Sequence, residues 1–85
     1  MHNGKYIVFN WKGMFGEEFE TPVLFPGHVT HSDMARTMQL KDNDIISAGF
    51  FQVDGPERVY CHGESVSLKK KSRIEDRHLI ERFIK

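Results

Sequence analysis

The residues best suited to covalent chemistry are Cys61 and His62, a thiol directly followed by an imidazole. A cysteine nucleophile needs a base within hydrogen-bonding reach. Adjacent residues on a β-strand project to opposite faces, so these two side chains cannot meet if the segment is a strand. We therefore expect Cys61 to be a small buried hydrophobic residue, and we expect no catalytic residue and no enzyme.

A second candidate for chemistry is the segment around two histidines. His28, His31 and Asp33 are three potential metal ligands within six residues. Their spacing does not match a strong zinc pattern, because such patterns repeat ligand pairs at fixed separations. The sequence predicts a polar entrance to a helix here, with no metal and no cofactor.

A third candidate is a basic segment made of Lys69, Lys70, Lys71 and Arg73. These four cations precede a predicted helix, and the free backbone amides at the start of a helix attract anions. Together they suggest binding of a phosphate or of nucleic acid. A lysine run in a loop is also commonly a solvated surface, and Ser72 and Glu75 would themselves occupy donors at the helix end. Phosphate or nucleic-acid binding remains the second functional hypothesis.

The fourth candidate is apolar. Trp11, Met14 and Phe15 place large hydrophobic groups in and beside a glycine-flanked turn, where a hairpin tip is usually polar. Either the tip folds back onto its own sheet, or these side chains anchor a partner protein. The sequence leaves both interpretations open.

The elements that position these residues follow from composition and periodicity. Four segments are rich in β-branched and aromatic residues and are predicted strands, namely residues 5–11, 18–25, 45–53 and 58–63. Pro22 lacks a ladder donor, which predicts an edge strand or a bulge. A turn at 54–57 should join the last two strands as a hairpin, and residues 64–68 either continue the fourth strand or form a loop.

Two helices are predicted from their start signals. Thr30 with Asp33 suggests a cap for a helix from about His31 to Gln39, and Ser72 with Glu75 forms a capping box for a second helix. The expected inward stripes are Val29, Met34, Ala35 and Met38 in the first helix, and Ile74, Leu79, Ile80, Phe83 and Ile84 in the second.

The resulting order is ββαββα in one α+β domain over residues 1–85. The simplest packing is a four-stranded, mostly antiparallel sheet with both helices on one face. The first strand, however, is apolar on both sides, with Ile7 and Phe9 on one and Tyr6 and Val8 on the other. Because two helices on one face would leave the other uncovered, that face must be covered either internally by a curled, half-closed sheet or by a second copy of the chain. Of these two we favour self-association as a homodimer.

Composition limits the surroundings of the chain. It has 85 residues, one cysteine and a formal net charge of zero. No apolar run approaches the roughly 20 residues that span a bilayer, and the first residues lack a secretion signal, so we expect no membrane association and a cytoplasmic location. Charge is segregated, since residues 13–57 hold two basic and eight acidic residues whereas residues 69–85 hold seven basic and three acidic.

Several segments resemble a group of short uncharacterised proteins encoded by bacteriophages and prophages. They are Lys5-Tyr6-Ile7-Val8-Phe9, His31-Ser32-Asp33-Met34-Ala35, Ser47-Ala48-Gly49-Phe50, Cys61-His62-Gly63-Glu64-Ser65-Val66-Ser67-Leu68 and Ser72-Arg73-Ile74-Glu75-Asp76 leading to Leu79-Ile80. The resemblance covers nearly the whole chain and implies a phage origin and a bacterial host cytoplasm. It implies no established activity and no functional residues.

The sequence therefore predicts a non-enzymatic phage accessory protein that acts by binding a host or phage protein, as a homodimer, with Trp11, Met14 and Phe15 as partner-binding residues. The alternative is a nucleic-acid or nucleotide-phosphate binding module that uses residues 69–73.

Overall fold

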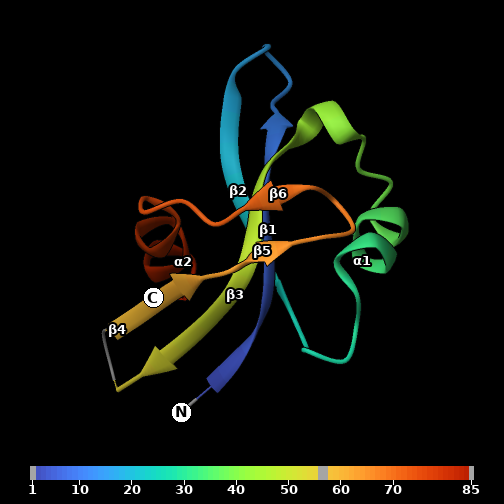
Figure 1. The fold of residues 1–85 in the computed structure, drawn as a ribbon. Coiled ribbons are helices and arrows are strands. Elements are labelled where there is room, and N and C mark those ends of the chain that lie inside the picture. The colour runs from blue at the N-terminus through green and yellow to red at the C-terminus, as the bar shows by residue number, and fades with distance from the viewer. Residues whose placement is uncertain (1, 56–57, 85) are drawn as a thin grey trace.

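The fold is α+β and follows the predicted order, as a computed structural model that describes residues 2–55 and 58–84 shows (Figure 1). A four-stranded antiparallel sheet is accompanied by two α-helices and a small two-stranded hairpin. The elements are β1 (His2–Lys12), β2 (Glu18–Phe25), α1 (His31–Thr37), the 3-10 turn η1 (Asp42–Asp44), β3 (Ile45–Asp54), β4 (Arg58–His62), β5 (Glu64–Ser65), β6 (Lys70–Lys71) and α2 (Asp76–Ile84).

The main sheet has the strand order β2-β1-β3-β4. β1 therefore pairs with a strand on each side, and β2 is an edge strand, which confirms the position predicted from Pro22. The register between β1 and β3 shifts between Val8 and Phe9, where β3 carries an extra residue. Pro56 and Glu57 of the predicted turn at 54–57 lie outside the described residues.

The two helices lie on opposite faces of this sheet, and the prediction of both helices on one face is wrong. Tyr6 and Val8 of β1 belong to a core cluster completed by Ile80 of α2. Ile7, between them in sequence, belongs to a second cluster completed by Ala35 of α1. Because neighbouring residues of a strand point to opposite faces, a central strand that is apolar on both sides needs cover on both.

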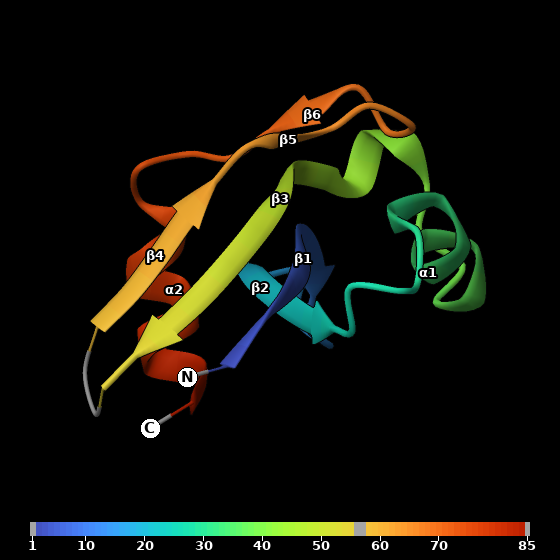
Figure 2. The same ribbon diagram turned by 60° about the horizontal axis from the view of Figure 1, so that its bottom comes forward.

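The second face is covered from within the chain. Besides α1, residues 64–71 form the β5–β6 hairpin, which contacts β3 and places Leu68 in the cluster on the α1 side. Residues 64–68, for which the sequence allows a strand or a loop, therefore form one strand of this hairpin and its turn. Figure 2 shows this hairpin beyond the end of β4, next to the first half of β3. The two-sided strands by themselves therefore do not require a second copy of the chain.

α1 is about two turns of helix with a confirmed cap. The backbone amide of Asp33 donates to Thr30 Oγ1 over 3.1 Å. Val29, Met34 and Ala35 pack inward as predicted, whereas Met38 follows the end of the helix and is partly exposed.

α2 begins later than predicted. The Asp76 carboxylate accepts the backbone amide of Arg73 over 2.8 Å, so the reciprocal cap sits one residue beyond the predicted Ser72–Glu75 box. Ile74 consequently precedes the helix and is exposed. Of the predicted inward stripe, Leu79 and Ile80 pack against the sheet, while the stripe's last two members are partly exposed.

Among the described residues, neither helix has the length and apolar character needed to cross a membrane.

Candidate functional site

The β1–β2 hairpin ends in a defined turn. The amide of Gly13 donates to the Glu17 carbonyl over 2.8 Å, and the amide of Gly16 donates to the Gly13 carbonyl over 3.2 Å. Gly16 has a φ of +84°, a left-handed conformation that glycine adopts without strain. The last paired residues before the turn are Lys12 and Glu18.

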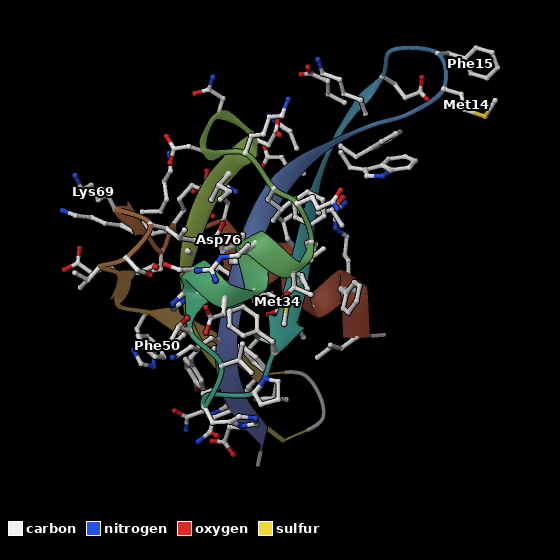
Figure 3. The ribbon with its side chains drawn as sticks, turned by 90° about the vertical axis from the view of Figure 1, so that its right-hand side faces the viewer. Met14, Phe15, Met34, Phe50, Lys69 and Asp76 are labelled. Atoms are coloured by element: carbon white, nitrogen blue, oxygen red, sulfur yellow. The ribbon has the colours of Figure 1, made fainter. Side chains whose placement is uncertain are left out.

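The side chains of Met14 and Phe15 point away from the molecule. They are 93% and 91% exposed, and Figure 3 shows both beyond the end of the hairpin. The Glu17 carboxylate accepts the backbone amide of Phe15 over 3.1 Å, which ties the backbone of the turn to its own base. The tip therefore does not fold back onto the sheet, and the partner anchor remains as a prediction for this turn.

Two further aromatic residues lie directly below the turn. Trp11 and Phe19 face each other across β1 and β2, with ring centroids 6.0 Å apart and about half of each side chain exposed. We call Trp11, Met14, Phe15 and Phe19 the tip patch. Sequence reasoning missed Phe19 as a member, although the pairing of residues 11 and 19 follows from the hairpin register around the turn.

The predicted basic segment is divided between two environments. Lys69 lies in the turn of the β5–β6 hairpin with a φ of 58°, and Lys70 and Lys71 form β6 (Figure 3). Arg73 instead reaches Glu20 over 2.7 Å and Asp76 over 2.9 Å. Two carboxylates thus already neutralise Arg73, and the structure does not bring the four cations together around one anion site.

The start of α2 is occupied by the protein's own carboxylate. Asp76 is fully buried, and besides the Arg73 amide it accepts the Arg73 Nε–H over 2.9 Å and the Tyr6 hydroxyl over 2.6 Å. Burial and the neighbouring carboxylate raise the pKa of Tyr6 far above its usual value, so the hydroxyl remains a donor. No sequence signal pointed to this buried network.

Cys61 and His62 project to opposite faces of the sheet, as predicted from their adjacency. Cys61 packs in the cluster under α2, whereas the His62 ring stacks on Phe50 on the other face. Burial, and then the charge of Asp76, raise the pKa of the Cys61 thiol to about 11. A thiol that stays protonated at neutral pH and lacks a base is a poor nucleophile.

The two histidines near α1 also have separate surroundings. His31 is buried between the rings of Phe25 and Phe50, and its Nε2–H donates to the Gly49 carbonyl over 2.9 Å. Burial lowers the pKa of His31, which favours the neutral ring. His28 is exposed. Within residues 2–55 and 58–84, no group of three or more histidine, cysteine, aspartate or glutamate side chains is placed to hold a metal.

The tip patch is thus the candidate site: its side chains lie at one end of the β1–β2 hairpin, and none of them belongs to either core cluster. Trp11, Met14 and Phe15 were singled out from the sequence, and the structure adds Phe19. No protein-family model, no curated protein and no solved structure matches this chain.

Proposed function

We propose that this chain is a non-enzymatic accessory protein of phage origin that binds a host or phage protein in the bacterial cytoplasm through the tip patch. The observation that supports the proposal is the near-complete exposure of Met14 and Phe15 on a structured hairpin tip. Exposed apolar groups that gather in one place mark interaction sites in proteins that are otherwise well packed.

The tip patch has the properties of a binding anchor. Aromatic residues dominate the energetics of protein interfaces, because they bury much apolar area with few rotatable bonds. The hydrogen bonds of Gly13, Phe15 and Gly16 already order the turn, so binding loses little backbone entropy there.

The charges around the tip patch indicate the chemistry of the partner. Lys12 is followed by Glu17 and Glu18, and all three are exposed. The rim of the tip is therefore net acidic, which favours an apolar pocket bordered by basic residues on the partner. Self-association would require the same tip to fit a basic-rimmed pocket on a second copy.

The test places a photo-crosslinking phenylalanine analogue at position 15. The wild-type hairpin should direct this group into the partner's pocket, so irradiation in host lysate should give one dominant protein adduct that survives nuclease treatment. The captured protein, purified, should then bind the unmodified chain in a titration. An adduct of two copies of this chain would identify self-association instead.

Two variants distinguish a specific anchor at Phe15 from the general effect of any exposed apolar side chain. Phe15→Asp should abolish the adduct partner's binding, because a charge cannot enter an apolar pocket without losing its hydration. Val66→Asp removes an equally exposed apolar residue from the β5–β6 turn and should leave binding unchanged. The proposal fails if Phe15→Asp remains folded and binds the purified partner as tightly as the wild type does.

A further inference from the structure

Two rows of side chains cross the sheet at the end opposite the hairpin tip. Residues paired across β1, β3 and β4 stand next to one another, so each row takes one residue from each strand. The rows are Lys5, Phe50 and His62, followed by Asn3, Gln52 and Tyr60. We call these six residues the row face.

The row face lies on the α1 side of the sheet, and α1 contacts it at Phe50. The Phe50 ring contacts His31 of α1 edge-on, with centroids 5.8 Å apart, which marks the limit of the helix cover. Figure 2 looks onto β3 and β4 from the side opposite α2: α2 lies behind these strands, and α1 lies to one side of them. Tyr60 is 46% exposed, and His62 is exposed as well.

The first row is an ordered stack. The rings of Phe50 and His62 are stacked, with centroids 5.8 Å apart and planes 17° apart, and Lys5 Nζ lies 6.0 Å from the Phe50 centroid. A hollow of about 350 Å³ adjoins the stack. It is bordered by Asn3, Gly4, Gly27, Phe50 and His62, among others.

We propose that the row face binds single-stranded nucleic acid. Unpaired bases stack on exposed aromatic rings, and on a sheet surface such rings hold successive bases. His62 and Tyr60 lie two residues apart on β4 and supply two rings, while the Asn3 amide at the hollow can hydrogen-bond a base edge. Lys5 supplies a cation for the phosphate backbone within the same row.

Charge favours this occupant over a second protein. The row face holds a lysine, amides and aromatic rings and no aliphatic side chain, whereas the core of a protein interface is mostly apolar. The adjoining β5–β6 hairpin carries Lys69, Lys70 and Lys71; Lys71 stands opposite Glu64 of β5, and the other two lysines add positive charge that favours a phosphate backbone. The carboxylates of Glu20 and Asp76 pair with Arg73, on the α2 side of the sheet and away from the row face.

The experiment measures anisotropy of fluorescein-labelled RNA and DNA single strands and of the matching duplex. Single strands should bind more tightly than the duplex. Whichever single strand, RNA or DNA, has the higher affinity identifies the natural ligand. Tyr60→Ala and His62→Ala should each weaken binding by about 5- to 100-fold, since each removes one stacking ring. Lys5→Gln should reduce the slope of log affinity against log salt concentration by about 1.

Matched controls come from the other end of β1. Phe15→Ala removes an exposed ring from the tip patch, and Lys12→Gln removes an exposed lysine from the same strand as Lys5. Neither should change the affinity at moderate salt by more than about twofold, because one distant charge adds only the non-specific share of binding. Amide chemical shifts of the wild-type protein should move on β1, β3 and β4 and not at residues 13–17.

Three results would overturn the proposal. The first is no binding at about 100 µM protein, the weak end of non-specific nucleic-acid binding. The second is binding that both ring variants retain but a triple Lys69, Lys70 and Lys71 to Gln variant loses, which would assign it to the basic hairpin. The third is a homodimer that Tyr60→Ala dissociates, which would make the row face an interface between copies.

Discussion

Asp76 carries a carboxylate that is fully buried and therefore needs hydrogen-bond partners and a counter-charge. It is 0% exposed, and an isolated carboxylate at such a position would be strongly unfavourable. The Tyr6 hydroxyl and three N–H groups of Arg73 surround it, so its charge is both paired and hydrogen-bonded. This network ties α2 to the central strand and fixes where the helix begins.

Removing the carboxylate should therefore destabilise the fold strongly. Asp76→Ala should lower the free energy of unfolding by about 3–5 kcal/mol, because it leaves the Arg73 guanidinium without its buried partner. Tyr6→Phe should cost about 1.5–3 kcal/mol, the range for a hydrogen bond to a charged group. Equilibrium urea unfolding followed by Trp11 fluorescence measures both.

Glu20→Gln is the control for this network, since its carboxylate pairs with the same arginine but is 45% exposed. Its cost should be about 1 kcal/mol or less, as for other exposed pairs. An Asp76→Ala variant no less stable than Glu20→Gln would show that the buried network does not hold the fold together.

The Cys61 thiol should react slowly in the folded protein. Its pKa of about 11 lies above the usual 9.0, so the thiolate is scarcer in the fold than in the unfolded chain. Alkylation by iodoacetamide should be slower natively than in urea at neutral pH and should rise about tenfold per pH unit below the pKa. Equal rates in the two conditions near neutral pH would contradict the burial of this thiol.

Stability should follow the same titration. The folded pKa is raised, so the protonated thiol contributes stability below pH 9.0, and that contribution is lost as the pH rises toward about 11. Cys61→Ala should remove this part of the pH dependence.

Single residues differed in how far the sequence could predict them. Met14 and Phe15 could be singled out because a local expectation, a polar hairpin tip, was violated within four residues. The Tyr6–Asp76 pair could not, because its members are 70 residues apart and each has an ordinary local role, one in a strand and one in a helix start. Tertiary packing alone brings them together.

α1 ends in a left-handed residue that is not glycine. Gln39 has a φ of 58°, its amide donates to the Arg36 carbonyl over 3.0 Å, and the amide of Leu40 donates to the Ala35 carbonyl over 2.9 Å. These two bonds form a Schellman motif, in which glycine is the preferred residue at the left-handed position.

Gln39→Gly should therefore stabilise the protein, by about 0.5–1 kcal/mol, because glycine adopts this conformation without a Cβ clash. Thermal unfolding followed by circular dichroism measures the change. Arg36→Gly, at an exposed position in the last turn of the same helix, should instead destabilise by about 0.5–1 kcal/mol. If both glycines shift the melting temperature in the same direction, the left-handed position is not what limits the helix end.

Element boundaries were predictable where the chain carries a periodic pattern and a cap, as in β2 and at the start of α1. The β5–β6 hairpin was not, because strands of two residues have no periodicity to detect. The start of α2 was displaced because the Ser72 amide, which Glu75 would accept in the predicted box, donates instead to the Gly63 carbonyl over 3.0 Å, while the Asp76 carboxylate accepts the Arg73 amide. A local pattern does not show this pairing with Gly63.

The central position of β1 organises the whole molecule. It pairs with β2 and β3, and its alternate residues hold the two core clusters on opposite faces. The two-sided apolar pattern of residues 6–9 already contained this information. The prediction of both helices on one face conflicted with this pattern, because it covered only one of the two apolar sides of the strand. In the structure both sides are covered, as the pattern requires.

This arrangement should give a graded pattern of amide exchange. Amides of residues 6–9 are buried between two paired strands, so they should open only with global unfolding and exchange most slowly. Residues 14–16 at the tip are exposed and their amides are held only by bonds within the turn, so these amides should exchange much faster than those of residues 6–9. Hydrogen–deuterium exchange followed by NMR resolves both groups.

The same measurement connects stability with binding. A partner on the tip patch should slow exchange at residues 13–17 without changing residues 6–9, because it covers the turn and leaves the core as it was. Single-stranded nucleic acid should instead slow exchange on β4, whose outer edge is unpaired and lies beside the row face. If the amides of the tip exchange as slowly as those of β1 in the protein alone, the tip is not exposed in solution. That result would indicate self-association through the tip.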